Sequence, residues 1–383
     1  MMIDIPNDEK SYVGKTIEFA RKQKNITIET LINGICSKQT YYKIKKSTIS
    51  ESEIYDSLLS KLNLYYDYTC TPVPSYDSLW KYFLDQNWDM FDREVQKIKF
   101  ELSDLDVYRY IIKITFELIE KDMDIALAKE ILPLLPDVMK EIVSYFILRY
   151  LYTEELKYDS DFSYLSLNTT INQCEYLLIL IKGKRYYDAS ILCNSLLQTT
   201  KGKMHYSVLI QKLFIIQAIQ PQAFDECCDE IIHDPCFIQN SDSANDFMYN
   251  AGMFHYVREN YNKAWSYLSD VCQNYKYRIP GMIFLYHMET ITNYRLNEHC
   301  LTEVCEMSRE EPYKVLLKYY QMKYDNIDFN ILEDYLWHDC RGIISYSYPQ
   351  DVVKKIIHDE LFWIADKTGD KRRYYQFNKK MNQ

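Results

Sequence analysis

The feature that most constrains the fold is a helical spacing of apolar residues that continues from about residue 10 onward. Near the N-terminus Val13, Ile17 and Ala20 recur at intervals of four and three residues, which places them on one face of an α-helix. Only 8 of 383 residues are glycine, against roughly 7% in average proteins. Folds that need many tight turns or glycine-rich phosphate loops are therefore disfavoured, and the sequence predicts an all-α protein.

The N-terminal part of the chain divides into four or five short helices with marked starts. Thr27 and Ser37 stand where N-caps are expected, because their hydroxyls can accept a hydrogen bond from a free backbone N–H. Gly34 lies between the second and third helices, where a tight turn favours a residue that tolerates positive φ.

The helical pattern is interrupted at Pro72 and Pro74, and proline disfavours a continuous helix. We therefore expect an N-terminal domain at residues 9–66, a linker at 67–76 and a second helical domain at 77–383.

Charge is distributed unevenly between these parts. The chain carries −10 in total, but residues 10–47 contain nine basic and two acidic residues, so this stretch carries +7 and the remainder −17. Such asymmetry favours a basic module that meets a polyanion, joined to an acidic body that does not. The alternative is a solvated helical face with no nucleic-acid partner.

Cysteine and histidine usage does not indicate a metal site or a disulfide framework. Eleven cysteines form no C-x-x-C pair, and the His233-Asp234-Pro235-Cys236 and Trp337-His338-Asp339-Cys340 segments lack a second ligand pair. No glycine-rich phosphate loop, G-x-S-x-G or H-E-x-x-H motif occurs. We expect no enzymatic activity, no cofactor and no metal.

The sequence also favours a protein of the cytoplasm. The N-terminus has no apolar run typical of a secretory signal, and no stretch approaches the length of apolar residues that spans a bilayer. We expect reduced thiols and no membrane partner.

Part of the second domain fits a tetratricopeptide unit, a helix pair of 34 residues. In residues 249–265, Gly252 stands where the first helix approaches the second, and Tyr261 and Ala264 fill the seam between them. Leu177 with Ala189 gives a second match, and two others are fainter. These matches predict a degenerate tetratricopeptide-like α-solenoid.

In such units the first helix lines a groove that accepts an extended peptide, and an Asn often holds the peptide backbone. The candidate peptide-binding residues are Asp246, Tyr249, Asn250, Met253 and Tyr256. The alternative is a helical core whose aromatic residues only pack against one another.

Residues 14–64 resemble the helix-turn-helix domain of the Cro/repressor type. The segment Gly34-Ile35-Cys36-Ser37 matches the turn into the recognition helix, which is then expected at 37–45. The resemblance is closest to peptide-pheromone-responsive regulators of low-GC Gram-positive bacteria, the Rgg, Rap, NprR, PlcR and PrgX group. That group joins this domain to a tetratricopeptide-like domain, in the order predicted here.

The resemblance implies a set of residues that contact DNA. Side chains of the recognition helix would face the major groove or its flanking phosphates, and basic residues at the end of the first helix would contact the backbone. The implied residues are Arg21, Lys22, Lys24, Ser37, Lys38, Gln39, Tyr42, Lys43 and Lys46.

The function that the resemblance implies is a homodimeric transcription regulator of quorum-sensing type. Double-stranded DNA is one partner, and a small signalling peptide that controls DNA binding is the other. Two positions depart from the family pattern: Ile28 replaces a phosphate-contacting Gln, and Lys45-Lys46-Ser47 replaces Glu-Asn-Gly. The alternative function is therefore a protein-interaction scaffold whose degenerate helix-turn-helix does not bind DNA.

Overall fold

The computed structural model is all-helical, which confirms the all-α part of the predicted fold class; the helix-turn-helix and tetratricopeptide-like arrangement stays a prediction. The described residues contain no β-strand; Tyr65 and Asp106 form an isolated parallel bridge. The chain divides into two compact units, Met1–Lys201 and Gly202–Gln383, and each is described by itself. The residues described are 5–46, 49, 51–67, 76–101, 106–121, 123–153, 162–238, 241–272, 275–296, 311–344 and 350–381.

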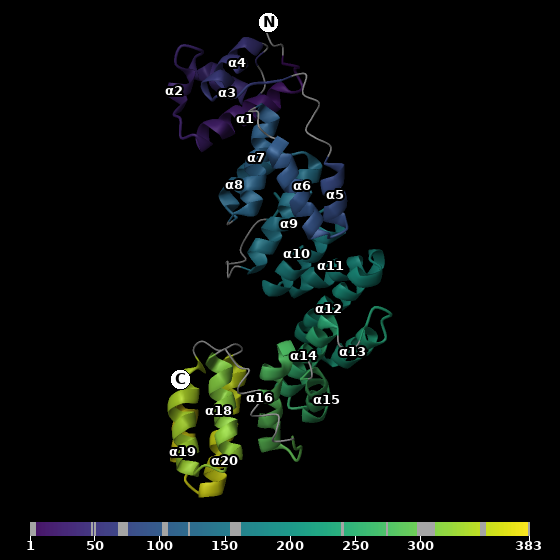
Figure 1. Ribbon diagram of the computed structural model, residues 1–383, viewed down its shortest axis with the longest axis vertical. Coiled ribbons are helices and arrows are strands. Elements are labelled where there is room, and N and C mark those ends of the chain that lie inside the picture. The colour runs from purple at the N-terminus through teal and green to yellow at the C-terminus, as the bar shows by residue number, and fades with distance from the viewer. Residues whose placement is uncertain are drawn as a thin grey trace. The chain divides into compact units, whose positions relative to one another are not determined.

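The first unit begins with four short helices whose starts were predicted in part. The Thr27 side chain accepts a hydrogen bond from Thr30 N at 3.2 Å, and Ser37 accepts one from Thr40 N at 3.1 Å, so both predicted N-caps are confirmed. Gly34 has φ of 75° in the turn between the second and third helices. The helices are α1 (Lys10–Gln23), α2 (Ile28–Ile32), α3 (Lys38–Ile44) and α4 (Ser52–Lys61) (Figure 1).

These helices enclose a small apolar core, and α1 crosses α3 at very close range. Val13, Ile17, Tyr41 and Ile44 are almost fully buried. Gly14 lies directly against the end of α3, where a Cβ would overlap the carbonyl oxygen of Ile44. Because that obstacle is backbone, the packing requires glycine at this position.

The same α1 helix also packs on a helix that follows the expected linker. Tyr12 stacks on Tyr108 of α7 (Val107–Glu120) with ring centroids 4.6 Å apart. The Tyr66 and Tyr108 hydroxyls both donate to the Glu9 carboxylate, at 2.6 and 2.5 Å. Residues 68–75 of the predicted linker lie outside the described residues, and the predicted domain boundaries stay a prediction.

The remainder of the first unit consists of helices that pack mainly on their sequence neighbours. Leu177 and Ala189, the residues of the second tetratricopeptide match, are fully buried on two adjoining helices. The helices are α5 (Asp77–Leu84), α6 (Trp88–Glu101), α7, α8 (Ile125–Ile131), a 3-10 turn (Leu132–Leu134), α9 (Asp137–Thr153), α10 (Thr170–Lys182) and α11 (Tyr186–Thr199).

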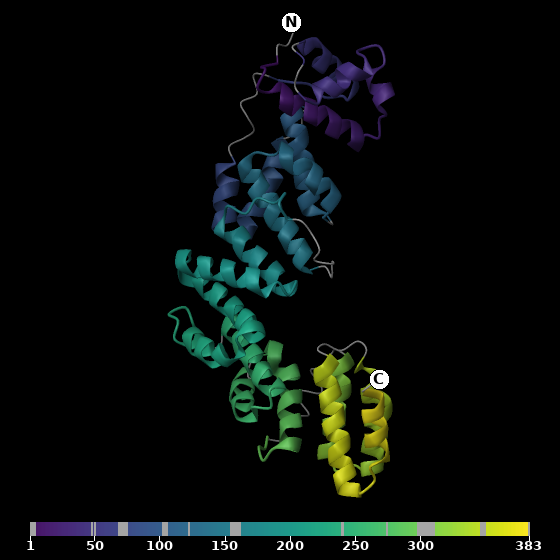
Figure 2. The same cartoon turned by 180° about the vertical axis from the view of Figure 1, so that it is seen from behind.

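The second unit contains the best tetratricopeptide match as a tightly packed helix pair. A Cβ on Gly252 of α14 would lie 2.7 Å from Leu268 Cγ of α15, and Ala264 is fully buried. The helices, also visible in Figure 2, are α12 (Gly202–Ile219), a 3-10 turn (Pro221–Ala223), α13 (Phe224–Ile232), α14 (Asp242–Val257), α15 (Tyr261–Val271), α16 (Tyr275–Ile291), α18 (Glu311–Tyr324), α19 (Phe329–Tyr335), a π-helical turn (Leu336–Cys340), α20 (Gln350–Thr368) and α21 (Arg372–Met381).

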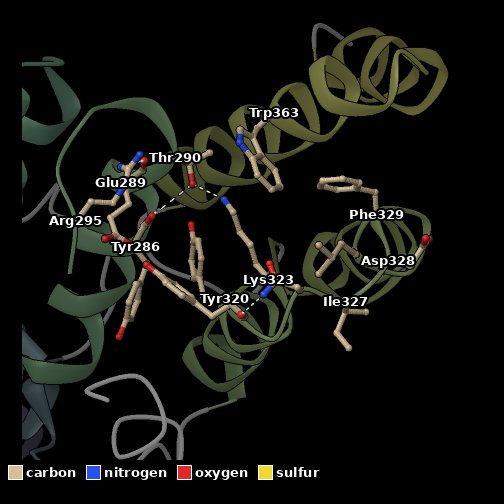
Figure 3. A pocket seen from close by; sticks show the side chains of 13 residues that line it. Tyr286, Glu289, Thr290, Arg295, Tyr320, Lys323, Ile327, Asp328, Phe329 and Trp363 are labelled. Carbon is tan, nitrogen blue, oxygen red and sulfur yellow. Dashed lines mark hydrogen bonds between the residues drawn. The ribbon is translucent and has the colours of Figure 1, made fainter. Parts of the chain in front are cut away.

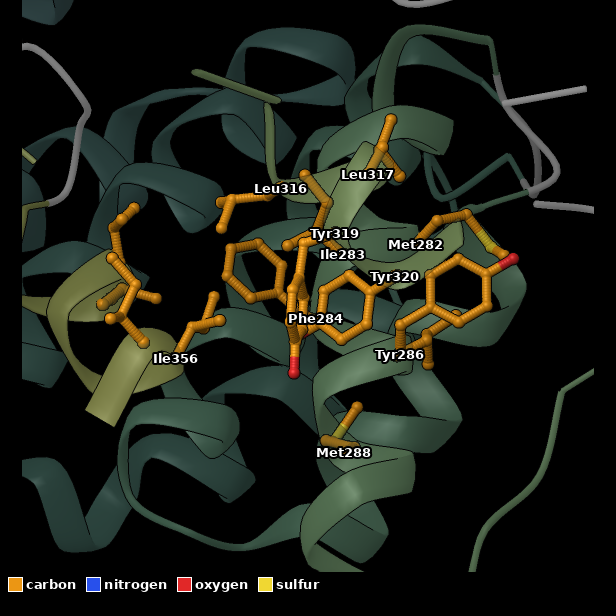
Figure 4. Packing of buried hydrophobic residues seen from close by; sticks show 14 of the residues in the cluster. Met282, Ile283, Phe284, Tyr286, Met288, Leu316, Leu317, Tyr319, Tyr320 and Ile356 are labelled. Atoms are coloured by element: carbon orange, nitrogen blue, oxygen red, sulfur yellow. The ribbon is translucent and has the colours of Figure 1, made fainter. Parts of the chain in front are cut away.

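Tyrosine supplies much of the core of the second unit. Figure 4 shows the rings of Tyr286, Tyr319 and Tyr320 among Phe284 and Ile356, and the three tyrosines are at most 1% exposed. In the part of the chain that the structure describes, no helix has both the length and the apolar character to cross a bilayer.

Candidate functional site

Helix α3 and the residues that flank it include most of the residues that the resemblance assigns to DNA. Its buried side consists of Tyr41 and Ile44, both at 0% exposure. The predicted DNA-contacting side chains in and beside α3 are exposed to solvent. Those that follow the N-cap Ser37 lie on one face of the helix. These exposed residues are Ser37, Lys38, Gln39, Tyr42, Lys43 and Lys46; Ser47 lies outside the described residues.

The exposed face is basic, and its Lys38 ion pair is open to solvent. Lys38 Nζ lies 2.8 Å from Glu29 Oε1, with 54% and 68% of the two side chains exposed. Exposed ion pairs of this kind contribute little to stability, so a phosphate can replace the Glu29 carboxylate at low cost.

Glu18 of α1 holds α3 in its orientation. Its carboxylate receives Arg21 Nε at 3.0 Å, the Tyr41 hydroxyl at 2.5 Å and Lys45 Nζ at 3.2 Å. Burial by itself would raise the pKa of Glu18, but the hydrogen bonds from Arg21, Tyr41 and Lys45 lower this pKa to about 2. Arg21 also donates to the Ile26 carbonyl oxygen at 2.8 Å. Arg21 therefore links Glu18 of its own helix to the loop that leads into α2.

The two lysines near the end of α1 also contact their own chain. Lys22 Nζ, near the end of α1, lies 2.6 Å from Glu130 Oε1 of α8. Lys24 Nζ donates to the Leu62 carbonyl oxygen after α4 and lies 5.8 Å from the centroid of the Tyr110 ring. The structure thus brings Lys22 and Lys24 to intramolecular partners and does not bring them to the exposed face of α3.

The predicted peptide-binding residues all lie on α14, but they differ in accessibility. Asp246, Tyr249, Asn250 and Met253 are half-buried, and Asn250 Nδ2 donates to the Asp246 carbonyl oxygen of its own helix at 2.7 Å.

Tyr256 does not line an open groove. Its side chain is 0% exposed, and its hydroxyl is hydrogen-bonded to Nδ1 of His287 on α16 at 2.6 Å. The helical spacing placed Tyr256 on the groove face, whereas α16 covers that position and makes it part of the core.

A cavity of about 590 Å³ in the second unit was not found by sequence reasoning. It lies among α16, α18, α19 and α20, and Figure 3 shows aromatic rings and charged groups around it. Its lining residues are Tyr286, Glu289, Thr290, Arg295, Tyr320, Lys323, Tyr324, Asn326, Ile327, Asp328, Phe329, Leu332 and Trp363.

A buried polar network borders this cavity. Glu360, at 0% exposure, accepts hydrogen bonds from Thr290 Oγ1 at 2.6 Å, the Tyr319 hydroxyl at 2.8 Å and Lys323 Nζ at 2.7 Å. The Lys323 ammonium also lies 3.9 Å from the centroid of the Trp363 ring, within cation–π range. Lys323 also donates to the Thr290 hydroxyl, so it is held by the Glu360 carboxylate, the Thr290 hydroxyl and the Trp363 ring.

The sequence carries no local signal for this cavity. Its residues come from separate segments with no characteristic spacing, and 37 positions separate Lys323 from Glu360. An aromatic residue at helical spacing predicts packing, and only the tertiary arrangement leaves a space between these rings.

Neither a metal centre nor a known relative identifies the site. Within the described ranges, no group of three or more His, Cys, Asp or Glu side chains is placed to hold a metal ion. Comparison with known proteins finds no matching family model, no matching curated protein and no matching solved structure.

Proposed function

We propose that this protein is a cytoplasmic, homodimeric transcription regulator that binds double-stranded DNA under the control of a small signalling peptide. In this proposal α1 to α4 form a Cro/repressor-type helix-turn-helix domain, and the later helix pairs form a tetratricopeptide-like peptide-binding domain. The observation that carries the proposal is the exposed face of α3, which presents Lys38, Gln39, Tyr42 and Lys43 together.

The chemistry of that face suits a DNA groove. Lysines contact phosphates, whereas the Gln39 amide can pair with a base edge. The N-terminus of α3 adds backbone N–H groups and the Ser37 hydroxyl, which favour an anion. The basic stretch at residues 10–47, with its balance of +7 in an acidic chain, supports the same partner.

The regulatory half of the proposal rests on the resemblance and on the helix pairs of the second unit. One helix-turn-helix reads a half-site, so a dimer must hold two of them roughly 34 Å apart or a multiple of that distance. Peptide binding that alters this separation would change DNA affinity, and DNA would change peptide affinity by the same factor.

A salt titration tests the DNA-binding proposal. Full-length protein is mixed with labelled genomic DNA fragments at low ionic strength, and the bound fraction is followed by mobility shift as salt is added. We expect binding that falls steeply with salt, because each phosphate contact releases counterions. The absence of a salt-sensitive shift would overturn the proposal.

The second candidate function is an interaction scaffold that does not bind DNA. It is favoured by the intramolecular contacts of Arg21, Lys22 and Lys24, which occupy the groups expected to contact phosphates. This candidate predicts no retarded DNA in the same titration.

A further inference from the structure

We propose that the cavity among α16, α18, α19 and α20 binds an apolar side chain of the signalling peptide, aromatic or branched aliphatic. This inference rests on the proposed function, from which it takes the class of ligand. It places the peptide site on residues of the C-terminal helices instead of on α14.

The size of the cavity fits a peptide segment, and its mouth fits an apolar side chain. Its volume of about 590 Å³ lies within the range of roughly 300 to 1,000 Å³ typical of ligand pockets. Ile327 and Phe329 at its border are 37% and 36% exposed, although both are apolar. An inserted apolar side chain would remove this surface from water, which is favourable.

The charges around the cavity argue for a ligand without large net charge. Among the described lining residues, the cations Arg295 and Lys323 are matched by the anions Glu289 and Asp328. The buried Glu360 carboxylate further compensates Lys323 at 2.7 Å. A phosphate-bearing ligand needs an excess of positive charge, which this lining does not offer.

A cationic ligand is disfavoured for a different reason. Aromatic cages bind ammonium groups through the faces of their rings, but the chain's own Lys323 ammonium already lies 3.9 Å from the Trp363 ring centroid. A second cation at that face would meet like-charge repulsion.

A peptide satisfies both the apolar and the polar parts of the lining. Its backbone offers N–H donors and carbonyl acceptors in equal number, and the border combines donors such as Asn326 with acceptors such as Asp328. The network of Glu360, Thr290 and Lys323 fixes one wall before binding, so little ordering cost remains there.

The probe for this inference is a pair of fluorescein-labelled heptapeptide mixtures with degenerate flanks. One mixture has Phe fixed at the central position and the other has Asp. Binding to the full-length protein is measured by fluorescence anisotropy, with Phe329→Ala as the test variant. The matched control is Ile331→Ala, which truncates another exposed apolar residue of α19 (53% exposed) that is not among the cavity-lining residues.

We expect the Phe mixture to bind and the Asp mixture to bind at least about tenfold more weakly. Phe329→Ala should weaken binding of the Phe mixture by about tenfold, as for loss of an anchoring contact, whereas Ile331→Ala should leave it within about twofold. Circular dichroism verifies that Phe329→Ala retains its helix content.

Three results would overturn the inference: no binding of the Phe mixture, equal binding of both mixtures, or sensitivity to Asn250→Ala without sensitivity to Phe329→Ala. Competition by inorganic phosphate or tetramethylammonium would also contradict it. The DNA mobility shift on the same preparation separates the two proposals. DNA binding without peptide binding defeats this inference alone, and peptide binding without DNA binding defeats the regulator.

Discussion

Glu18 of α1 accepts a hydrogen bond of 2.5 Å from the hydroxyl of Tyr41 on α3. Tyr41 is fully buried, whereas its neighbour Tyr42 is exposed. Together with the burial of Ile44, the bond holds the rotation of α3 about its own axis, so that the basic face meets the solvent.

The Glu18 network predicts that the stability of the α1–α3 packing depends on pH. The pKa of Glu18 is lowered from 4.5 to about 2, so its stabilisation is present above about pH 4.5 and is lost as the pH falls towards 2. Glu18→Gln should cost up to about 3 kcal/mol at pH 7.

Hydrogen exchange of α3 amides during a urea titration measures this effect at pH 7 and at pH 3. The difference in the free energy of opening of α3 between the wild type and Glu18→Gln should be smaller at pH 3 than at pH 7. Glu53→Gln, which changes an exposed carboxylate of α4, serves as the control. An equal difference in the free energy of opening at both pH values would show that the Glu18 charge does not stabilise this packing.

Gly14→Ala should destabilise the same helices by about 1–3 kcal/mol, the usual cost of overpacking. The added methyl would overlap the Ile44 carbonyl oxygen, and the backbone of α3 would have to shift. We expect faster exchange of α3 amides and weaker DNA binding.

The control is Gly342→Ala, where an added Cβ meets nothing within 4 Å and helix propensity favours alanine. This variant should be as stable as the wild type or slightly more so. If Gly14→Ala were equally harmless, the close crossing of α1 and α3 would be incorrect.

Lys43→Ala combined with Lys46→Ala should lower DNA affinity by about tenfold or more at low salt and make the log–log salt slope shallower by about two. Both side chains are exposed at the end of α3, so the helix content should not change. Lys113→Ala with Lys203→Ala removes the same charge from exposed positions outside α1 to α4 and should preserve the slope. An unaltered slope in the α3 variant would exclude this face as the contact with DNA.

A charge exchange between Lys22 and Glu130 distinguishes the two roles of Lys22. The ion pair of 2.6 Å predicts that Lys22→Glu loosens the contact of α1 with α8, and that adding Glu130→Lys restores it. DNA affinity of the double variant should lie within about twofold of the wild type, because the exchanged pair restores the contact and leaves the net charge unchanged. Persistent weak binding in a mobility shift would instead place Lys22 at the DNA backbone.

Local features of the helices could be predicted because their causes lie within a few residues. Thr27 and Ser37 cap helices by accepting hydrogen bonds from N–H groups three positions later. Gly34 adopts a positive φ, which glycine tolerates better than other residues. The small residues Gly252 and Ala264 lie in one helix pair, and both are at the contact between its two helices.

Features that depend on distant partners could not be predicted in this way. The sequence around Gly14 does not show why glycine is needed there, because the reason is the contact with the Ile44 carbonyl oxygen. Lys22 finds Glu130 at a separation of 108 residues, and Tyr256 is covered by His287 at a separation of 31. Periodicity assigns a face to each residue, but it does not say which other helix covers that face.

The ion pair beside the cavity gives the last prediction, because its two partners should depend on each other. Lys323 and Glu360 have 14% and 0% of their side chains exposed, and removing one partner of a buried pair typically costs about 3–5 kcal/mol. Lys323→Met leaves the Glu360 carboxylate buried beside two hydroxyl donors only, so we expect a loss of about 3 kcal/mol in urea unfolding of the full chain. Adding Glu360→Gln should recover most of this loss in stability, since the amide is neutral and Met still packs on Trp363.

Lys354→Met, beside the 96% exposed Asp351 side chain, is the control and should change the stability little. A double variant no more stable than Lys323→Met would show that charge compensation is not what holds these helices together.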